Sequence, residues 1–116
     1  MKECVFCRIV KGEKKNIVYE NGNFISFYDI NQDVKGHALV ISKKHFKTTL
    51  DLPSSLGTEF LDCIKKTALK IMKEVKAEGF NVINNNFSAA GQFVEHVHFH
   101  IFPRKSDDGL HGTYLA

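Results

Sequence analysis

Residues 96–102 alternate polar and apolar side chains and read His-Val-His-Phe-His-Ile-Phe. Successive side chains of a β-strand point to opposite faces, so we expect His96, His98 and His100 to share one face. Any half-exposed strand alternates in this way, but three of the six histidines of the chain fall in register here. Imidazole has an unperturbed pKa of about 6.5 and provides both base and acid near neutral pH. The pattern therefore indicates a strand face that performs chemistry.

Apolar residues also recur at steps of three and four between residue 53 and about residue 77, which predicts one long helix with a buried stripe. Ser54 or Ser55 is expected to be its N-cap, with Glu59 as the acid of a capping box. Gly79 is expected to stop it. The buried stripe comprises Leu56, Phe60, Ile64, Ala68, Ile71 and Val75.

Five segments are expected to form strands: Ile17–Glu20, Phe24–Tyr28, His37–Ser42, Phe80–Asn85 and His96–Pro103. Asn21-Gly22 predicts a hairpin turn, because both residues tolerate positive φ. A short helix over Cys4–Lys11 is expected to end at Gly12, as a C′ glycine, and the tail from Arg104 to be loose. The order of elements favours an α+β fold, a five-stranded antiparallel sheet with one long helix and a short N-terminal helix.

Composition indicates a globular chain, with 43% hydrophobic and 25% charged residues. We expect a single domain over residues 1–116. No run of apolar residues is long enough to span a membrane, and no signal-peptide core is visible, so the cytoplasm is the expected compartment. The net charge of +3 weakly favours anionic ligands but falls short of a nucleic-acid footprint. Three cysteines, an odd number, argue against a disulfide framework.

The His-x-His-x-His motif followed by two apolar residues resembles the signature of the histidine triad (HIT) superfamily of nucleotide hydrolases and transferases. The similarity extends to the Cys-x-x-Cys pair, the segments 27–30 and 36–45, and Gly91-Gln92 before the triad. The sequence is most similar to prokaryotic relatives of the purine-nucleoside phosphoramidase (Hint-like) branch. The resemblance implies a single HIT domain that acts on the α-phosphate of a purine nucleotide such as an AMP or GMP derivative.

The resemblance assigns catalytic roles to three histidines. His98 would attack the α-phosphorus and form a nucleotidyl-imidazole intermediate, which water then hydrolyses. That chemistry needs a neutral imidazole with one free nitrogen and the other fixed as N–H by a hydrogen bond. His100 would contact phosphate or shuttle a proton to the leaving group. His37 would contact phosphate, although an ordinary strand-end histidine would look the same.

The resemblance also implies a set of nucleotide contacts. Asp29 would accept hydrogen bonds from both ribose hydroxyls, or it is a turn residue that ends a strand. Asn85 would contact phosphate or the leaving group. Gly91 would let the backbone approach phosphate closely, with Gln92 beside it. The apolar wall around the purine would comprise Val5, Phe6, Ile9, Phe27 and Ile30, for which core packing is the alternative.

Phe93 departs from the family pattern, because many relatives carry Ser or Thr at this position. Candidate substrates are nucleoside phosphoramidates and dinucleoside polyphosphates. The alternative is a nucleotide-binding or interaction module with incidental turnover. A zinc-stabilised nucleic-acid binder is disfavoured, since the chain lacks a basic stripe with interleaved aromatics. The resemblance also implies a homodimer that pairs through the long helix and an adjoining strand.

Cys4, Cys7, His45 and His96 form a second constellation. The two cysteines of a Cys-x-x-Cys turn can point at one ion, and two distant histidines complete a Cys2His2 set. Similar prokaryotic family members hold a structural zinc at these positions. A redox motif and two thiols packed in a short helix are the alternatives. Such a closed zinc site would stabilise the fold and would not activate water.

Overall fold

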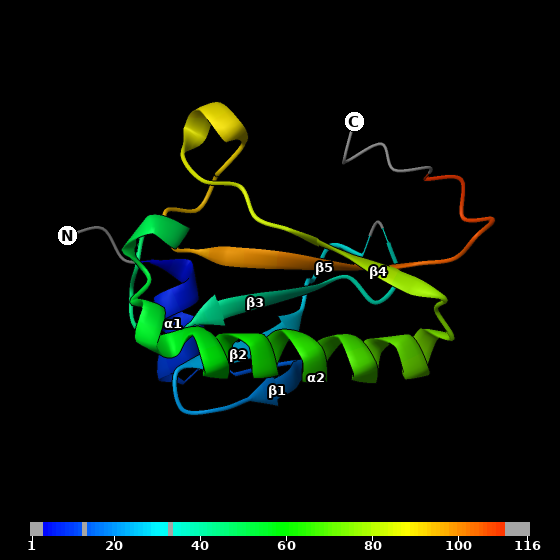
Figure 1. Ribbon diagram of the computed structural model, residues 1–116, viewed down its shortest axis with the longest axis horizontal. Helices are drawn as coiled ribbons and strands as arrows, with labels where there is room; N and C mark the ends of the chain where they lie inside the picture. The colour runs from blue at the N-terminus through cyan, green and yellow to red at the C-terminus, as the bar shows by residue number, and fades with distance from the viewer. Residues whose placement is uncertain (1–3, 13, 33, 111–116) are drawn as a thin grey trace.

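The computed structural model describes residues 4–12, 14–32 and 34–110, and shows one antiparallel sheet with strand order β1-β2-β3-β5-β4 (Figure 1). The strands are β1 (Ile17–Glu20), β2 (Phe24–Tyr28), β3 (Ala38–Ser42), β4 (Gly79–Ile83) and β5 (His98–Arg104). The helices are α1 (Val5–Lys11) and α2 (Gly57–Val75), with short 3-10 turns η1 (Thr49–Asp51), η2 (Ser54–Leu56) and η3 (Ser88–Ala90). The predicted fold class is confirmed. Over the described ranges, no helix combines the length and apolarity that crossing a membrane requires.

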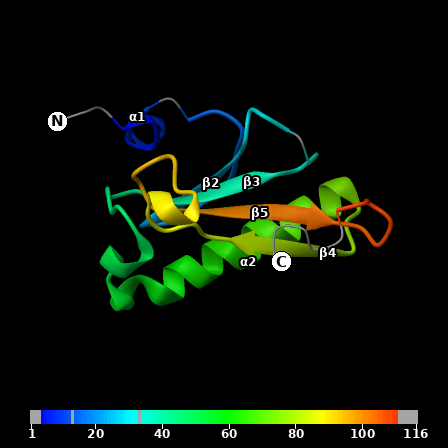
Figure 2. The same cartoon turned by 90° about the horizontal axis from the view of Figure 1, so that it is seen from above.

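The two helices cover opposite faces of the sheet, as Figures 1 and 2 show from two directions. The long helix α2 packs on one face, where its buried stripe meets side chains such as Phe24, Val40 and Ile101. On the other face, Phe6 of α1 packs with residues such as Ile25 and Leu39. The central strands are therefore buried on both sides, which explains why β3 is apolar almost throughout.

The predicted caps of the long helix are wrong. Ser54 and Ser55 lie in η2, and α2 begins after Leu56 with no side-chain cap. The Glu59 carboxylate instead accepts hydrogen bonds from the backbone N–H and side-chain amide of Asn23, at 3.0 and 2.8 Å. At the other end, Lys76 adopts the left-handed conformation that terminates the helix. A tertiary contact to the β1–β2 turn thus replaces the local capping box.

The turn residues also behave differently from the prediction. The β1–β2 hairpin forms, but neither Asn21 nor Gly22 has positive φ. The Asn21 side chain instead accepts hydrogen bonds from the backbone N–H groups of Asn23 and Phe24. Gly12 ends α1 with φ of 176°, extended backbone that any residue can adopt, so it is not a left-handed cap.

The segment after β5 is more ordered than predicted, because Arg104 pairs with Asp108 and the Asp108 carboxylate accepts from two backbone N–H groups. The expectation of a loose tail is therefore wrong for residues 104–110. Residues 111–116 of that tail lie outside the described residues.

Candidate functional site

The histidine motif occupies the centre of the sheet. β5 pairs with β3 on one side and β4 on the other, with His98 opposite Ile41 and His100 opposite Leu39. The intervening residues Val97, Phe99 and Ile101 belong to the core under α2. The predicted alternation therefore holds, although the regular strand begins at His98 and His96 lies just before it. The histidines face the same side of the sheet as α1.

His98 presents one free nitrogen to a cavity. Its Nδ1–H donates to the backbone carbonyl of His96 at 2.8 Å, so Nε2 is the ring nitrogen left for a ligand. The ring of Phe6 packs edge-on against the imidazole, with centroids 5.2 Å apart. The side-chain amide of Asn84 donates to the His98 carbonyl at 3.0 Å. These contacts fix the orientation of the imidazole before any ligand binds.

His100 and His37 form a hydrogen-bonded pair that ends at a carboxylate. His37 Nε2 and His100 Nδ1 lie 3.0 Å apart, and His37 Nδ1 lies 3.4 Å from a carboxylate oxygen of Asp29. Phe102 stacks on His37, with centroids 4.1 Å apart. Burial, helped by the neighbouring His98 and His37, lowers the pKa of His100 to about 4. The pair offers a path for a proton beside His98.

These side chains line a cavity of about 780 Å³. The structure brings most of the predicted site together there: Phe6, Asp29, His37, Asn85, Gly91, His98 and His100. Several predicted contacts lie elsewhere. Ile9 and Phe27 pack in the core beneath α1, and Ile30 is 86% exposed outside the lining. Val5 is exposed on α1, and Gln92 is buried in the β4–β5 segment. The nucleotide-contact roles of these five residues stay predictions.

Some lining residues were not predicted from the sequence: Asn31, Leu39, Ile83, Val94 and Phe102. The sequence contains a signal for two of these residues, Leu39 and Phe102. Leu39 lies two residues after His37 and Phe102 two residues after His100, so strand alternation alone places them on the same face. Ile83 and Val94 reach the cavity only through the pairing of β4 with β5 and the path of their connection, which local periodicity does not report.

Cys4, Cys7, His45 and His96 converge, with their ligand atoms all within 4.8 Å of one another. The Cys4 and Cys7 sulfurs lie 3.4 and 3.6 Å from His96 Nδ1, and the Cys7 sulfur lies 3.4 Å from His45 Nδ1. Tetrahedral zinc with these donors separates its ligand atoms by about 3.3–3.8 Å. His96 donates its other ring N–H to the Ser42 carbonyl at 2.8 Å, as metal-binding imidazoles usually do. The donor set therefore fits zinc.

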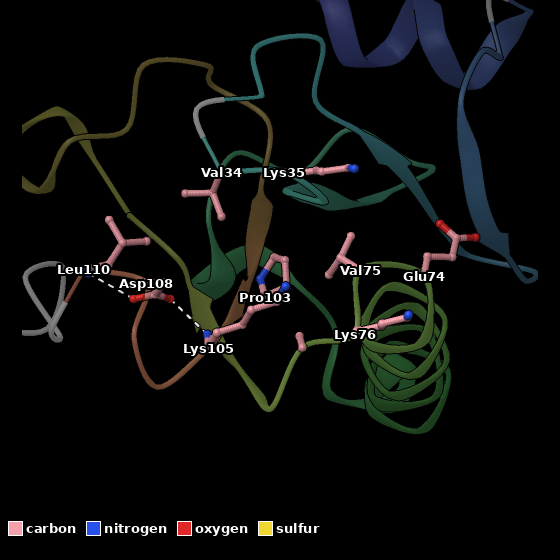
Figure 3. Close-up of a pocket in the computed structure, with 10 residues that line it drawn as sticks. Val34, Lys35, Glu74, Val75, Lys76, Pro103, Lys105, Asp108 and Leu110 are labelled. Carbon is pink, nitrogen blue, oxygen red and sulfur yellow. Dashed lines mark hydrogen bonds between the residues drawn. The ribbon is translucent and has the colours of Figure 1, made fainter.

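A second cavity, of about 500 Å³, lies beside the C-terminal ends of α2 and β5 (Figure 3). Its two carboxylates are already engaged, Glu74 by the Tyr28 hydroxyl and Asp108 by Arg104. Its described lining holds no histidine or cysteine, so it is not the candidate site. That lining comprises Val34, Lys35, Glu74, Val75, Lys76, Ala77, Pro103, Lys105, Asp108 and Leu110.

An antiparallel sheet that carries a His-x-His-x-His motif on a central strand is the arrangement of a histidine triad domain. The family model for the HIT domain matches residues 11–107, and the chain belongs to this family.

Two named relatives show its place within the family. An uncharacterized HIT-like protein of Methanocaldococcus jannaschii is 43% identical over 107 residues, or 91% of this chain and 82% of that one. The adenosine 5'-monophosphoramidase hnt1 of Schizosaccharomyces pombe is 39% identical over 106 residues, or 90% and 77% of the two chains.

Among solved structures, a Zn-bound histidine triad family protein from Mycobacterium smegmatis is similar, with a TM-score of 0.83 and 35% identity. The similarity covers 92% of this chain and 78% of that one.

Proposed function

We propose that this protein hydrolyses purine nucleotides at the α-phosphate through a covalent nucleotidyl intermediate on His98. The observation that carries the proposal is the hydrogen bond from His98 Nδ1 to the His96 carbonyl, which leaves Nε2 as the ring nitrogen available for attack in a residue that lines the cavity. Membership of the HIT family and similarity to an adenosine 5'-monophosphoramidase support nucleotide hydrolase activity. A nucleoside phosphoramidate, such as an adenylyl-amine, is the proposed substrate class.

The reaction takes two steps. The lone pair of His98 Nε2 forms a bond to the α-phosphorus while the bond from phosphorus to the leaving amine breaks. Because the lowered pKa of His100 leaves that ring uncharged at neutral pH, the departing nitrogen takes up a proton from solvent that is relayed through the hydrogen-bonded His37–His100 pair. Water then attacks the same phosphorus, the bond to Nε2 breaks, and a proton of the water returns to solvent through the same pair to give the nucleoside monophosphate. Because each imidazole is already oriented by hydrogen bonds, little reorganisation is needed during either step.

We place the nucleoside on the side of the cavity formed by α1 and β3. Phe6 and Leu39 provide an apolar surface for a purine there, and Asp29 lines the same cavity. The Asp29 carboxylate accepts from the Asn31 backbone N–H at 3.1 Å and retains lone pairs for a ribose diol. Its second contact, at 3.4 Å to His37, links ribose binding to the histidine pair.

Zinc is the proposed structural ion of the Cys4, Cys7, His45 and His96 cluster. A closed Cys2His2 set contributes folding free energy and leaves no open coordination position. His96 belongs to this cluster and also supplies the carbonyl that orients His98. An ion at the cluster would therefore hold the acceptor that selects the tautomer of His98.

We also propose a homodimer formed through α2 and β4. Leu61 and Leu69 on α2, and Phe80 and Val82 on β4, are large apolar side chains left exposed on the described surface. Sedimentation velocity should give a dimer for the wild type, whereas Leu61→Lys with Leu69→Lys should give a monomer. A wild-type monomer at micromolar concentration would contradict the proposed homodimer.

The proposed activity is tested by incubating the protein with adenosine 5'-phosphoramidate in 18O-labelled water. We expect AMP and ammonia as products, with one labelled oxygen in the phosphate of AMP. The matched control substrate is the phosphoramidate of an acyclic alcohol, which lacks both ribose and purine and should react much more slowly. Nucleotide binding without product would support the alternative of a binding module.

A further inference from the structure

We infer that the β4–β5 connection forms a subsite for an amine leaving group that carries an aromatic ring, with Phe93 as its stacking surface. The inference rests on the proposed function and deepens it, because it names the leaving group. The observation behind it is the exposure of Phe93, at 95% the highest among the large apolar side chains of the described residues. This ring nevertheless lines the cavity that holds His98 and His100.

The two residues on either side of Phe93 are held in place by burial and packing. Gln92, before it, is 5% exposed, and Val94, after it, packs against the core beneath α1. The backbone at Phe93 is therefore held in place by the packing of both neighbours. An exposed aromatic ring held beside a reactive cavity is typical of a surface that contacts a ligand.

The Gln92 side chain stabilises the β4–β5 connection through hydrogen bonds. Its carbonyl oxygen accepts from the backbone N–H of Phe87 at 2.7 Å, and its amide donates to the carbonyls of Lys47 and Val94 at 2.6 and 3.0 Å. Gly91 has a φ of 93°, in the left-handed region that favours glycine, and packs beside the Asn85 amide. The connection is therefore internally hydrogen-bonded, which keeps the cost of ordering it on ligand binding low.

The position of Phe93 in the fold assigns it to the leaving group. The reactive strand β5 lies between β3 and β4, and the proposed nucleoside contacts lie on the β3 side. The nucleoside and the leaving group diverge from the α-phosphorus, so a nucleoside on the β3 side directs the leaving group to the β4 side. The lining on that side is Ile83, Asn85, Gly91 and Phe93.

The charge of the cavity selects an amine over a polyphosphate. Over the part of the chain that the structure describes, neither lysine nor arginine lines this cavity, and its one carboxylate is Asp29. A polyphosphate leaving group would bring several negative charges without a cationic partner, which is costly to desolvate. An amine leaves neutral once protonated, and an apolar ring attached to it can rest on Phe93.

The test uses adenosine 5'-phosphoramidates of benzylamine and of cyclohexylmethylamine, which differ mainly in the aromaticity of one ring. Aromatic pairs contribute about 0.5–1.5 kcal/mol beyond area burial, so we expect wild-type kcat/KM to favour the benzylamine derivative by about 3- to 10-fold. Phe93→Leu should bring this ratio close to one, and Phe93→Tyr should preserve it. Because Phe93 is exposed, both variants should fold.

The matched control is Phe87→Leu, which changes another exposed phenylalanine of the same connection that does not line the cavity. The ratio should stay at its wild-type value in this variant. A ratio unaffected by Phe93→Leu, or faster wild-type turnover of diadenosine tetraphosphate than of either phosphoramidate, would overturn the inference. Release of ammonia from adenosine 5'-phosphoramidate by the wild type would show that the proposed function survives that result, whereas no release would mean that the function itself fails.

Discussion

His96 and His98 are the same kind of residue, two positions apart, and their surroundings give them different tasks. His96 is fully buried, with Nε2 donating to the Ser42 carbonyl and Nδ1 pointing at the two cysteine sulfurs. His98 is 7% exposed, with one nitrogen donating to the His96 carbonyl and the other facing the cavity. Both nitrogens of the first ring have partners within the protein, and the second ring has one partnered nitrogen and lines the cavity.

The comparison shows that the role of an imidazole follows from the partners of its two nitrogens rather than from its place in a motif. A ring with both nitrogens committed stabilises the fold, and a ring with one committed nitrogen can act as a nucleophile. The two roles are coupled in this protein, because the backbone of His96 orients the ring of His98. Substitutions that separate stability from turnover should therefore distinguish the two residues.

The largest expected effect is the loss of turnover in His98→Ala. Removing the nucleophile should lower kcat for adenosine 5'-phosphoramidate by at least about 1,000-fold. The melting temperature and the affinity for AMP should stay close to the wild-type values, because the ribose contact and the cluster are untouched. A rate within tenfold of wild type would exclude His98 as the nucleophile.

A substitution in the Cys/His cluster that contains His96 should mainly lower the free energy of unfolding. Cys7→Ser removes one donor of the cluster, and weakening zinc binding by about 100-fold lowers the free energy of unfolding by about 2.7 kcal/mol. That loss corresponds to roughly 10 °C in melting temperature for a chain of this size. The fraction that stays folded should keep most of its turnover.

The control for Cys7→Ser is the third cysteine, Cys63, which is buried on the sheet-facing side of α2, away from the cluster. A chelator should lower the melting temperature of the wild type and of Cys63→Ala by more than that of Cys7→Ser, because zinc contributes less to the stability of that variant. Elemental analysis should find about one zinc per chain in the first two proteins. Metal-free wild-type protein, purified without chelator, would count against the site.

Asp29→Ala should separate binding from chemistry. Hydrogen bonds to a charged group contribute about 1.5–3 kcal/mol each and do not add fully on one carboxylate, so AMP affinity should fall by about 30- to 150-fold. Calorimetry with 2',3'-dideoxy-AMP is the control, since this ligand lacks both hydroxyls. An equal loss for both ligands would mean that Asp29 acts only through His37 or as a turn residue.

The last prediction concerns the dependence of stability on pH. Burial lowers the folded-state pKa of His100 to about 4, below the ordinary value of 6.5, so the unfolded chain binds the proton first as the pH falls. The stabilisation is complete above about pH 6.5 and is lost toward pH 4, with a slope of at most about 1.4 kcal/mol per pH unit from this group. Urea titrations between pH 7 and pH 4 should show a smaller loss for His100→Gln than for the wild type.

Alternation and helical periodicity were sufficient to predict the fold and the strand that carries the histidines. Both signals depend on residues close in sequence, and β5 and α2 are regular elements whose buried faces repeat. The predictions that were wrong depend on contacts between residues far apart in the sequence. Glu59 bonds to Asn23 rather than capping its own helix, and such a pairing appears only when the hairpin and the helix are packed together.

The residues of the candidate site also fall into those that could be predicted from the sequence and those that could not. The spacing of the three triad histidines was visible in the sequence, whereas the ligands of the cluster and the roles of the histidines were predicted from the family resemblance. Apolar contacts were harder to predict, since the same residue type fills a core and lines a cavity. Ile30 was expected at the purine and is exposed, whereas Leu39 was not predicted and lines the cavity. Gln92 is predicted to lie near phosphate, and its side chain forms hydrogen bonds that stabilise the segment carrying Phe93.

The central claim is a covalent intermediate on His98, and a rapid-quench experiment tests it most directly. Wild-type protein is mixed briefly with adenosine 5'-phosphoramidate, quenched at neutral to alkaline pH to protect the phosphorus–nitrogen bond, and digested with trypsin. Residues 77–104 contain all three triad histidines and no internal lysine or arginine, so fragmentation of that peptide locates the modified residue. We predict an adenylyl group on His98 that is absent from His98→Ala, and turnover with the group on His100, or with no adduct at any quench time, would contradict the account.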